Sequence, residues 1–271
     1  ISWDSPWGKG RPGWHIECSA MIRAAFGEQI DIHGGGRDLI FPHHENEIAQ
    51  SEALTGKQFV RYWMHNGLIK VNGQKMSKSL GNSLLLDDLM DKFSPDALKF
   101  ALLSNNYRND VNVTDELFPA AEAHVARFYA LIGRAEQMFP DEKGMEKAID
   151  EKFDAAMEDD FNTALALADL FGYFKEVARL LDAGDAKARR MTNQIRATYS
   201  LLGLFKRDPA AYLATYEKAE EIPADVLAVA EERKAARAAR DWAKSDELRE
   251  KLKAMGYAVK DAKDGYTLTK I

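Results

Sequence analysis

The chain has 271 residues, of which 46% are apolar and 30% charged, with one cysteine and a formal net charge of −6. This composition excludes a disordered chain, a collagen-like fibre and a disulfide-stapled mini-protein, and no apolar run approaches the roughly 20 residues that cross a bilayer. At roughly 150 residues per domain the length predicts about two domains, and a cysteine without an internal partner indicates a reducing cytoplasm.

Charge is distributed in blocks along the chain. Residues 53–86 contain no acid and five basic residues, residues 87–160 carry 18 acids against 8 bases, and residues 231–271 carry 11 bases against 8 acids. A net charge of −6 by itself counts against a nucleic-acid partner. A charge run is usually a solvated face, and that interpretation stays open for each block. Because two basic zones flank the acidic one, however, the average does not exclude nucleic acid.

The chain begins at Ile1 and enters at once a stretch rich in Trp, Pro and Gly, ISWDSPWGKGRP. A compact fold rarely starts in this way. We therefore expect a piece of a longer protein whose N-terminal part is missing. Removal of an initiator or leader peptide is the alternative, and the stretch itself is too polar for a signal peptide.

Residues 1–52 alternate turn signals with short apolar runs, as βα units do. The glycine run 34–36 is expected to form a loop whose backbone can approach a ligand closely. Pro42 suits the first turn of a helix over residues 43–54. Strand segments are expected over 59–72, followed by a Gly-bounded loop.

From residue 84 onward the pattern becomes helical. Ser94-Pro95 marks a helix start, and apolar residues recur at helical spacing over 114–139, 148–183 and 185–205. Residues 223–255 form another charged helix or pair of helices, and residues 257–270 a β-hairpin with an Asp264-Gly265 turn. The predicted fold class is therefore α/β, then a helical bundle, then a small α+β unit.

Three residues of the first region can bind a metal. His43 and Glu47 are four apart on a predicted helix, so they share one face, and Cys18 adds a thiolate. A sulfur, nitrogen and oxygen donor set suits Zn²⁺. The alternatives are a cysteine buried for packing and a His/Glu pair on the surface.

The Gly-bounded loop contains Lys75-Met76-Ser77-Lys78-Ser79. Two lysines and two hydroxyls in a short loop can gather around a polyphosphate and offset the charge that develops on a leaving pyrophosphate. A solvated basic loop is the alternative.

Several segments resemble the cysteinyl-tRNA synthetase family of class I aminoacyl-tRNA synthetases. The most specific are GRPGWHIECSAM at 10–21, DIHGGGRDLIFPHHENEIAQSEA at 31–53 and KMSKSLGN at 75–82. Supporting matches are DALKF at 96–100, MEDDFNTALAL at 157–167 and the basic stretch at 233–256. They occur in the family's chain order and cover essentially the whole chain.

The resemblance implies a domain order and a reaction. Residues 1–52 would form the C-terminal part of a Rossmann-type catalytic domain, 53–92 a stem-contact region with the KMSKS loop, 93–222 a helical bundle, and 223–271 a small basic anticodon-region domain. The reaction would join L-cysteine to its tRNA through a cysteinyl-adenylate formed from ATP, with Mg²⁺ accompanying the ATP. No membrane is involved.

The resemblance also assigns residues by type of site. The zinc ligands would be Cys18, His43 and Glu47, with a fourth cysteine ligand and the His-Ile-Gly-His motif expected in the missing N-terminal part. The cysteine and ATP contacts would be Trp14 beside the cysteine, Gly36 and Asp38 at the nucleotide ribose, and the catalytic lysines Lys75 and Lys78 at the phosphates. The nucleic-acid contacts would be Arg233, Arg237, Arg240 and Trp242.

Alternative assignments remain open. Trp14 can be an ordinary core aromatic, Asp38 a loop cap, and Trp242 a core residue of its helix. At the level of function, one rival is the cysteine:amino-sugar ligase of mycothiol biosynthesis, which shares the zinc and KMSKS-like elements. A small sugar acceptor would not need the basic residues 223–271, so that tail is the discriminating feature. The other rival is a non-catalytic tRNA-binding fragment.

Overall fold

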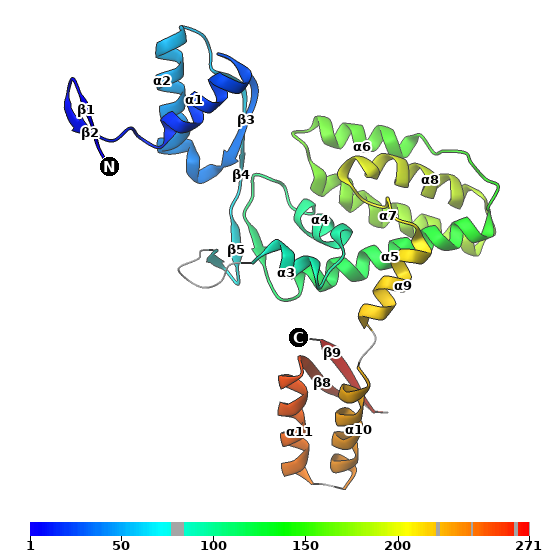
Figure 1. The fold of residues 1–271 in the computed structure, drawn as a ribbon. Coiled ribbons are helices and arrows are strands. Elements are labelled where there is room, and N and C mark those ends of the chain that lie inside the picture. Colours follow the sequence, from blue (N-terminus) through cyan, green and yellow to red (C-terminus); the bar gives the residue numbers. More distant parts are fainter. Residues whose placement is uncertain (77–83, 221–222, 240, 263–264, 271) are drawn as a thin grey trace.

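The computed structural model describes residues 1–76, 84–220, 223–239, 241–262 and 265–270. Figure 1 shows three parts in chain order: an N-terminal lobe, a helical bundle, and a C-terminal unit of two helices and a hairpin. None of the helices in these described ranges has the length and apolarity that a membrane crossing requires.

The N-terminal lobe is built on a pair of parallel strands. A short hairpin of β1 (Trp3–Ser5) and β2 (Gly8–Gly10) leads into α1 (His15–Phe26), and β3 (Ile30–Gly36) then pairs in parallel with β4 (Val60–Asn66). Parallel strands need a crossover, which α2 (Glu45–Thr55) supplies. The register partners Ile32 and Tyr62 are both exposed, so one face of this sheet is uncovered by the described residues.

The connection from β3 to α2 differs from the prediction. The glycine run 34–36 is the end of β3 and not a loop, because its backbone pairs with Met64, His65 and Asn66 of β4. The helix begins at Glu45, two residues later than predicted, and Ile40–His44 forms an irregular turn before it. Phe41 interrupts this turn with extended backbone, as expected for a residue that precedes proline.

The stem-contact region forms a small mixed sheet. The strands predicted over 59–72 are confirmed as β4 and β5 (Ile69–Val71). β5 pairs antiparallel with β6 (Gln74–Lys75) and parallel with β7 (Val111–Val113), which lies far along the chain. Residues 77–83, with most of the predicted KMSKS loop, lie outside the described residues. The short helix α3 (Leu86–Met90) follows.

The helical bundle contains the larger buried apolar cluster of the described chain. Its helices are α4 (Pro95–Leu103), α5 (Leu117–Met138), α6 (Ala148–Glu158), α7 (Thr163–Asp182), α8 (Lys187–Tyr199) and α9 (Pro209–Glu220). The predicted start of α4 is confirmed, because the Ser94 side chain accepts from the Ala97 N–H at 3.1 Å and Pro95 occupies the first turn. The rings of Phe128 and Phe174 stack at 4.3 Å where α5 crosses α7.

The stretch over 148–183, in which helical spacing was predicted, contains two helices. Asp160 and Phe161 both adopt positive φ, at 53° and 54°, which ends α6. Asn162 then caps α7 by accepting from the Leu165 N–H. The sequence pattern does not mark this break, because the apolar residues on both sides of it keep helical periodicity.

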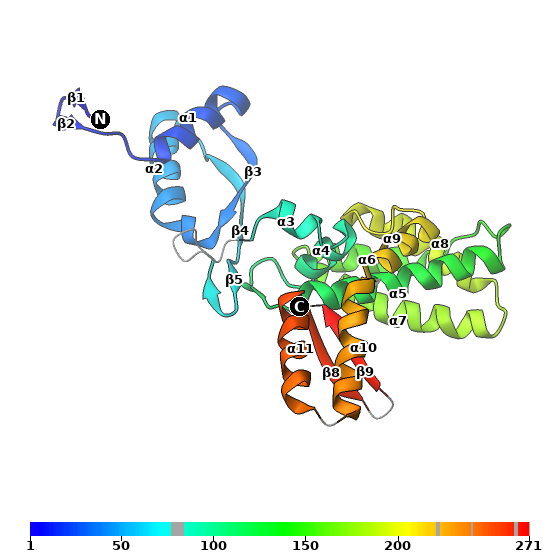
Figure 2. The same cartoon turned by 60° about the horizontal axis from the view of Figure 1, so that its bottom comes forward.

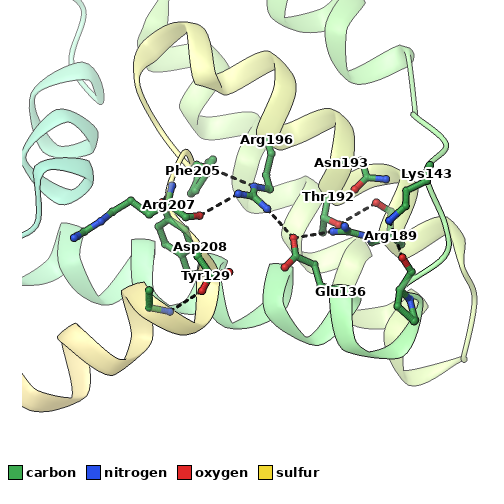
Figure 3. Close-up of polar contacts among 12 residues, drawn as sticks. Tyr129, Glu136, Lys143, Arg189, Thr192, Asn193, Arg196, Phe205, Arg207 and Asp208 are labelled. Carbon is green, nitrogen blue, oxygen red and sulfur yellow. Dashed lines mark hydrogen bonds and ion pairs between the residues drawn. The ribbon is translucent and has the colours of Figure 1, made fainter.

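A partly buried carboxylate joins α5 to α8 (Figure 3). Glu136 accepts from Arg189 at 2.9 Å and from Arg196 at 2.7 Å. Arg196 also donates to the carbonyls of Phe205 and Arg207, which follow α8. These contacts fix the turn that carries the chain from α8 into α9.

The C-terminal unit has its own apolar cluster. It consists of α10 (Ala224–Ala238), α11 (Trp242–Ala254) and a hairpin of β8 (Tyr257–Ala262) and β9 (Gly265–Lys270). Figure 2 shows the two helices side by side with the hairpin against them. Of the helix or pair of helices predicted over 223–255, the structure has the pair. The predicted hairpin is confirmed, although residue 264 of its turn lies outside the described residues.

Candidate functional site

The structure brings Cys18, His43 and Glu47 together from three different elements. Cys18 lies on α1, His43 at the end of the irregular turn and Glu47 in the first turn of α2. One ligand atom from each lies within 4.8 Å of the others. The predicted convergence of sulfur, nitrogen and oxygen donors is therefore present in the fold.

Glu47 has the environment of a metal ligand. Its side chain is 0% exposed, and Oε1 lies 2.7 Å from the Nε2 of His43. Beyond this contact with His43, Oε1 has no hydrogen-bond partner among the described residues. A buried carboxylate oxygen that accepts no hydrogen bond lowers the stability of the fold by about 1–3 kcal/mol or more, unless a cation or a proton satisfies it. The residues therefore fit a zinc ion.

Electrostatics around Cys18 depend on such a cation. Burial raises the pKa of the thiol, and the negative charges of Glu47 and Glu17 raise it further. A bound divalent ion reverses this effect, because a coordinated thiol is deprotonated outright. A cation bound between these donors would therefore hold Cys18 as a thiolate.

A layer of imidazoles behind the three donors was missed by sequence reasoning. His33 Nε2 lies 2.7 Å from the second oxygen of Glu47, and His44 Nδ1 lies 2.8 Å from His65 Nε2. The ring of Trp63 stacks on His33 at 4.7 Å. His65 lies next to the carboxyl end of the parallel strand β4, a position that could have pointed to it, whereas His33 is the middle residue of β3 and had no such signal.

The imidazole of His44 is held neutral. Burial lowers its pKa to about 4, with the neighbouring His33 and His65 acting in the same direction. Burial also lowers the pKa of His65, followed by the effects of His33 and Arg108. At neutral pH the pair therefore shares one proton in a hydrogen bond and adds no positive charge beside the donor set.

The glycine run makes room for the buried imidazoles. A Cβ at Gly35 would lie 2.7 Å from Cε1 of the buried His44 ring, whereas a Cβ at Gly34 would meet only the Met64 carbonyl at 3.6 Å. We expect Gly35→Ala to displace His44 and to lower the opening free energy of β3 and β4 by about 1–3 kcal/mol. Hydrogen exchange of the strand amides measures this. Gly34→Ala is the matched control, with an expected change within about 0.5 kcal/mol; equal effects at both positions would contradict the assignment.

The other predicted residues of the N-terminal lobe lie around the donor set. The Trp14 ring is 62% exposed and its centroid lies 4.2 Å from that of His43, so it is a wall of the site and not a core aromatic. Asp38 is exposed in the short turn after β3. Its Oδ1 would lie 2.6 Å from a Cβ at Gly36, so a side chain there would make the exposed Asp38 carboxylate move aside.

The predicted phosphate-binding lysines are described only in part. Lys75 lies on β6, opposite Lys70 on β5, and its side chain is outside the described residues. Lys78 falls within 77–83, which are also outside them. Their contact with ATP remains a prediction.

The nucleic-acid residues of the C-terminal unit separate into two groups. Arg233 is 2% exposed, so this side chain belongs to the interior and we drop it from the predicted nucleic-acid surface. Trp242 is 57% exposed and is not a core residue, and the guanidinium of Arg237 lies 5.6 Å from its ring centroid. Arg240 lies outside the described residues.

Comparison with known proteins agrees with this geometry. Residues 1–123 match the family model of class I (C) tRNA synthetase catalytic domains, residues 152–206 the DALR domain, and residues 219–267 the cysteinyl-tRNA ligase anticodon-binding domain. The chain is 45% identical over 98% of its length to a cysteine–tRNA ligase of Ectopseudomonas mendocina, and 44% identical over 97% of its length to one of Thermodesulfovibrio yellowstonii.

The chain belongs to the cysteinyl-tRNA synthetase family. It spans 57% of the length of the Ectopseudomonas relative and 58% of the Thermodesulfovibrio one. The fold expected from the resemblance is confirmed, as class I catalytic and DALR matches occupy the predicted order.

Solved structures of class I synthetases share the fold. The LeuRS of Agrobacterium radiobacter K84, in a ternary complex with tRNA, superposes with a TM-score of 0.59 at 16% identity, over 81% of this chain and 34% of that one. The methionyl-tRNA synthetase of Mycobacterium tuberculosis gives 0.50 at 19% identity, over 68% of this chain and 43% of that one. At these identities the likeness concerns the fold of the family and not its substrate.

Proposed function

We propose that this chain carries the cysteine-selecting and tRNA-binding parts of an ATP-dependent cysteine–tRNA ligase. The observation that carries the proposal is the convergence of Cys18, His43 and Glu47, with an orphaned buried Glu47 oxygen, beside the exposed ring of Trp14. The relatives named cysteine–tRNA ligase support the substrate and the acceptor.

Cys18, His43 and Glu47 would hold a zinc ion. When bound, zinc supplies a Lewis-acidic position that a soft substrate thiolate occupies far better than a hydroxyl does. A shape pocket distinguishes a single missing group by only about 1–3 kcal/mol, so a donor set of this kind can separate cysteine from serine more sharply. His33 holds the second oxygen of Glu47 and thereby orients this ligand.

The remaining residues of the lobe bind and orient the substrates. Trp14 closes one side of the cysteine position, and Gly36 with Asp38 offers a close backbone and a carboxylate to the ribose hydroxyls of ATP. The positive charges of Lys75 and Lys78 would lie at the phosphates of Mg²⁺–ATP. The cysteine carboxylate then attacks the α-phosphate, which gives cysteinyl-adenylate and releases pyrophosphate. A ribose hydroxyl of the terminal adenosine of the tRNA then attacks the acyl carbon, and AMP leaves.

The same assignment divides the chain at the boundaries predicted from the sequence. Residues 1–52 and 53–92 would carry the catalytic and stem-contact parts, 93–222 the bundle, and 223–271 the anticodon-region contacts. In the last of these, Arg237 and the ring of Trp242 present a cation and a stacking face together, which suits unpaired bases. We propose Arg237, Arg240 and Trp242 as this contact surface.

The comparisons favour a tRNA acceptor over an amino sugar. An anticodon-binding domain model matches residues 219–267, a region that a cysteine:amino-sugar ligase has no need of. A non-catalytic role in tRNA binding remains the second candidate, because the chain spans 57% of its relative's length.

Substitution with Co²⁺ tests the proposal on the chain itself. We expect the Co²⁺-loaded chain to show thiolate-to-cobalt absorption from Cys18, and this absorption to increase when L-cysteine adds a second thiolate. L-serine, matched in shape, should leave the spectrum unchanged. An identical response to both amino acids, or none to cysteine, would contradict thiolate selection by the donor set. Cysteine binding without tRNA charging would favour the second candidate.

A further inference from the structure

The segment over 105–113, between α4 and α5, lies outside the donor set yet contacts both the lobe and the bundle. Its backbone runs along the start of β5, where the Gly67 N–H donates to Tyr107 at 2.8 Å and the Val111 N–H donates to Leu68 at 3.0 Å. From there β7 continues in parallel register with β5. We call residues 105–113 the strap.

Backbone contact fixes where the strap lies. A Cβ at Gly67 would lie 2.1 Å from the carbonyl oxygen of Asn109 and 2.6 Å from the nitrogen of Asp110. No side chain fits there, so the two backbones approach as closely as glycine allows. The position of Asp110 relative to β5 is therefore set by main-chain packing and not by its own side chain.

The carboxylate of Asp110 is shared by three donors. Oδ1 accepts from the Leu68 N–H at 2.9 Å, and Oδ2 lies 2.8 Å from both the guanidinium of Arg37 and the ammonium of Lys70. The Asp110 side chain is only 16% exposed, less than either cation. Three contacts lower the pKa of Asp110 to about 2. The largest effect is the hydrogen bond from Lys70, followed by the hydrogen bond from the Leu68 amide and the positive charge of Arg37.

The two cations come from different functional elements. Arg37 stands between Gly36 and Asp38, in the turn that ends β3. Lys70 stands on β5, directly opposite Lys75 on β6. An isolated exposed ion pair contributes little, about 0–1 kcal/mol, but this carboxylate also bonds a backbone amide and bridges two elements from a fixed position.

The far end of the strap is fixed to the bundle. Arg108 forms two hydrogen bonds with the Asp160 carboxylate, at 2.6 and 3.0 Å, and Tyr107 donates to the same group at 2.9 Å. Asp160 has positive φ, a conformation that a non-glycine residue keeps only where its surroundings determine it. The strap therefore runs from the α6–α7 turn of the bundle to the turn after β3.

We propose that Asp110 is a positioning residue that holds the turn carrying Gly36 and Asp38 against the hairpin carrying Lys75, with the strap transmitting the position of the bundle to both. The nucleotide-binding part of this role rests on the proposed function. The two halves of the ATP site lie on separate elements, and the shared carboxylate sets the distance between them.

The test compares Asp110→Asn with Asp115→Asn, which removes the same charge from an exposed position in the same connection. Asparagine still accepts from the Leu68 N–H but no longer binds two cations. We expect hydrogen exchange in the 271-residue chain to rise about 10-fold in both 36–39 and 69–75, with α5 unchanged, and no change in the control. Unchanged exchange in either segment would overturn the proposal that Asp110 holds the turn and the hairpin together.

A second variant separates this tie from general destabilisation. Arg37→Gln removes the partner in the turn, and the double variant with Asp110→Asn should accelerate exchange in 36–39 no more than either single change does. Additive effects would overturn the role of the pair. This readout needs no enzymatic activity, so it decides the tie even if the proposed function fails.

Ligand affinity tests the positioning of the nucleotide. Asp110→Asn should raise the dissociation constant for Mg²⁺–ATP about 10-fold and leave L-cysteine binding to the Co²⁺-loaded chain unchanged. Equal loss of both ligands would overturn a role specific to the nucleotide, as would unaltered ATP affinity. A wild-type chain that binds no ATP would count against the proposed function, and the exchange experiment would then decide the tie alone.

Discussion

Glu47→Gln is expected to weaken zinc binding by on the order of 10²-fold, from about one zinc per chain in the wild type. Glutamine has nearly the same shape, so the change removes the charge and leaves the packing of a fully buried side chain in place. It also turns a ligand oxygen that lacks any hydrogen-bond partner among the described residues into part of an amide. Metal analysis after dialysis, and competition with a chelator of known affinity, measure the loss.

The matched control is Glu45→Gln, an exposed glutamate two residues earlier on the same helix. It changes the net charge of α2 by the same amount as Glu47→Gln does. It should leave the zinc affinity within about twofold of the wild-type value, because solvent and salt screen exposed charges. Zinc retained at full affinity in Glu47→Gln would remove Glu47 from the ligand set. Equal loss in both variants would indicate a general electrostatic effect and not coordination.

Asp96→Ala is expected to destabilise the helical bundle by about 3–5 kcal/mol. The buried Asp96 carboxylate accepts from the Tyr129 hydroxyl at 2.8 Å and from the Phe205 N–H at 2.9 Å. Burial raises the pKa of Tyr129, so its hydroxyl stays a donor at all ordinary pH values. Alanine leaves two donors unsatisfied in the core, and it releases a residue, Phe205, whose φ is 57°.

Asp96→Asn is the control for this prediction. Its amide oxygen keeps both hydrogen bonds, so the expected loss is about 1 kcal/mol, the part due to charge. Urea unfolding followed by far-ultraviolet circular dichroism gives both values. A loss below about 1 kcal/mol in Asp96→Ala would mean that water or another acceptor reaches the two donors.

Local sequence signals located most of the helices and strands correctly. The Ser94-Pro95 start of α4 was readable because both residues act through their own backbone and the next turn. The break between α6 and α7 was not, since Asp160 keeps its positive φ in a structure where Arg108 and Tyr107 bind its carboxylate. The glycine run 34–36 was expected in a loop because glycine is commonest there, whereas its function at Gly35 is to admit the His44 ring.

The candidate site shows the same division. Cys18, His43 and Glu47 could be selected from their donor types and spacing, and the resemblance of the surrounding segments assigned them one role. The orphaned oxygen of Glu47 and the imidazole layer of His33 and His44 required coordinates, because burial and hydrogen-bond partners are properties of packing.

Length and composition indicated a globular chain without a long apolar run or a set of paired cysteines, and the quoted motifs pointed to a cysteinyl-tRNA synthetase. Both conclusions depend on residue types and on residues close together in the chain, and these can be read directly from the sequence. The tertiary structure decided which of the charged residues act together. Arg233 is interior and Trp242 is exposed although they lie on adjacent helices, and Asp110 pairs both with Arg37, 73 residues earlier in the chain, and with Lys70. Burial and long-range pairing arise only when distant segments pack, so no local pattern contains them.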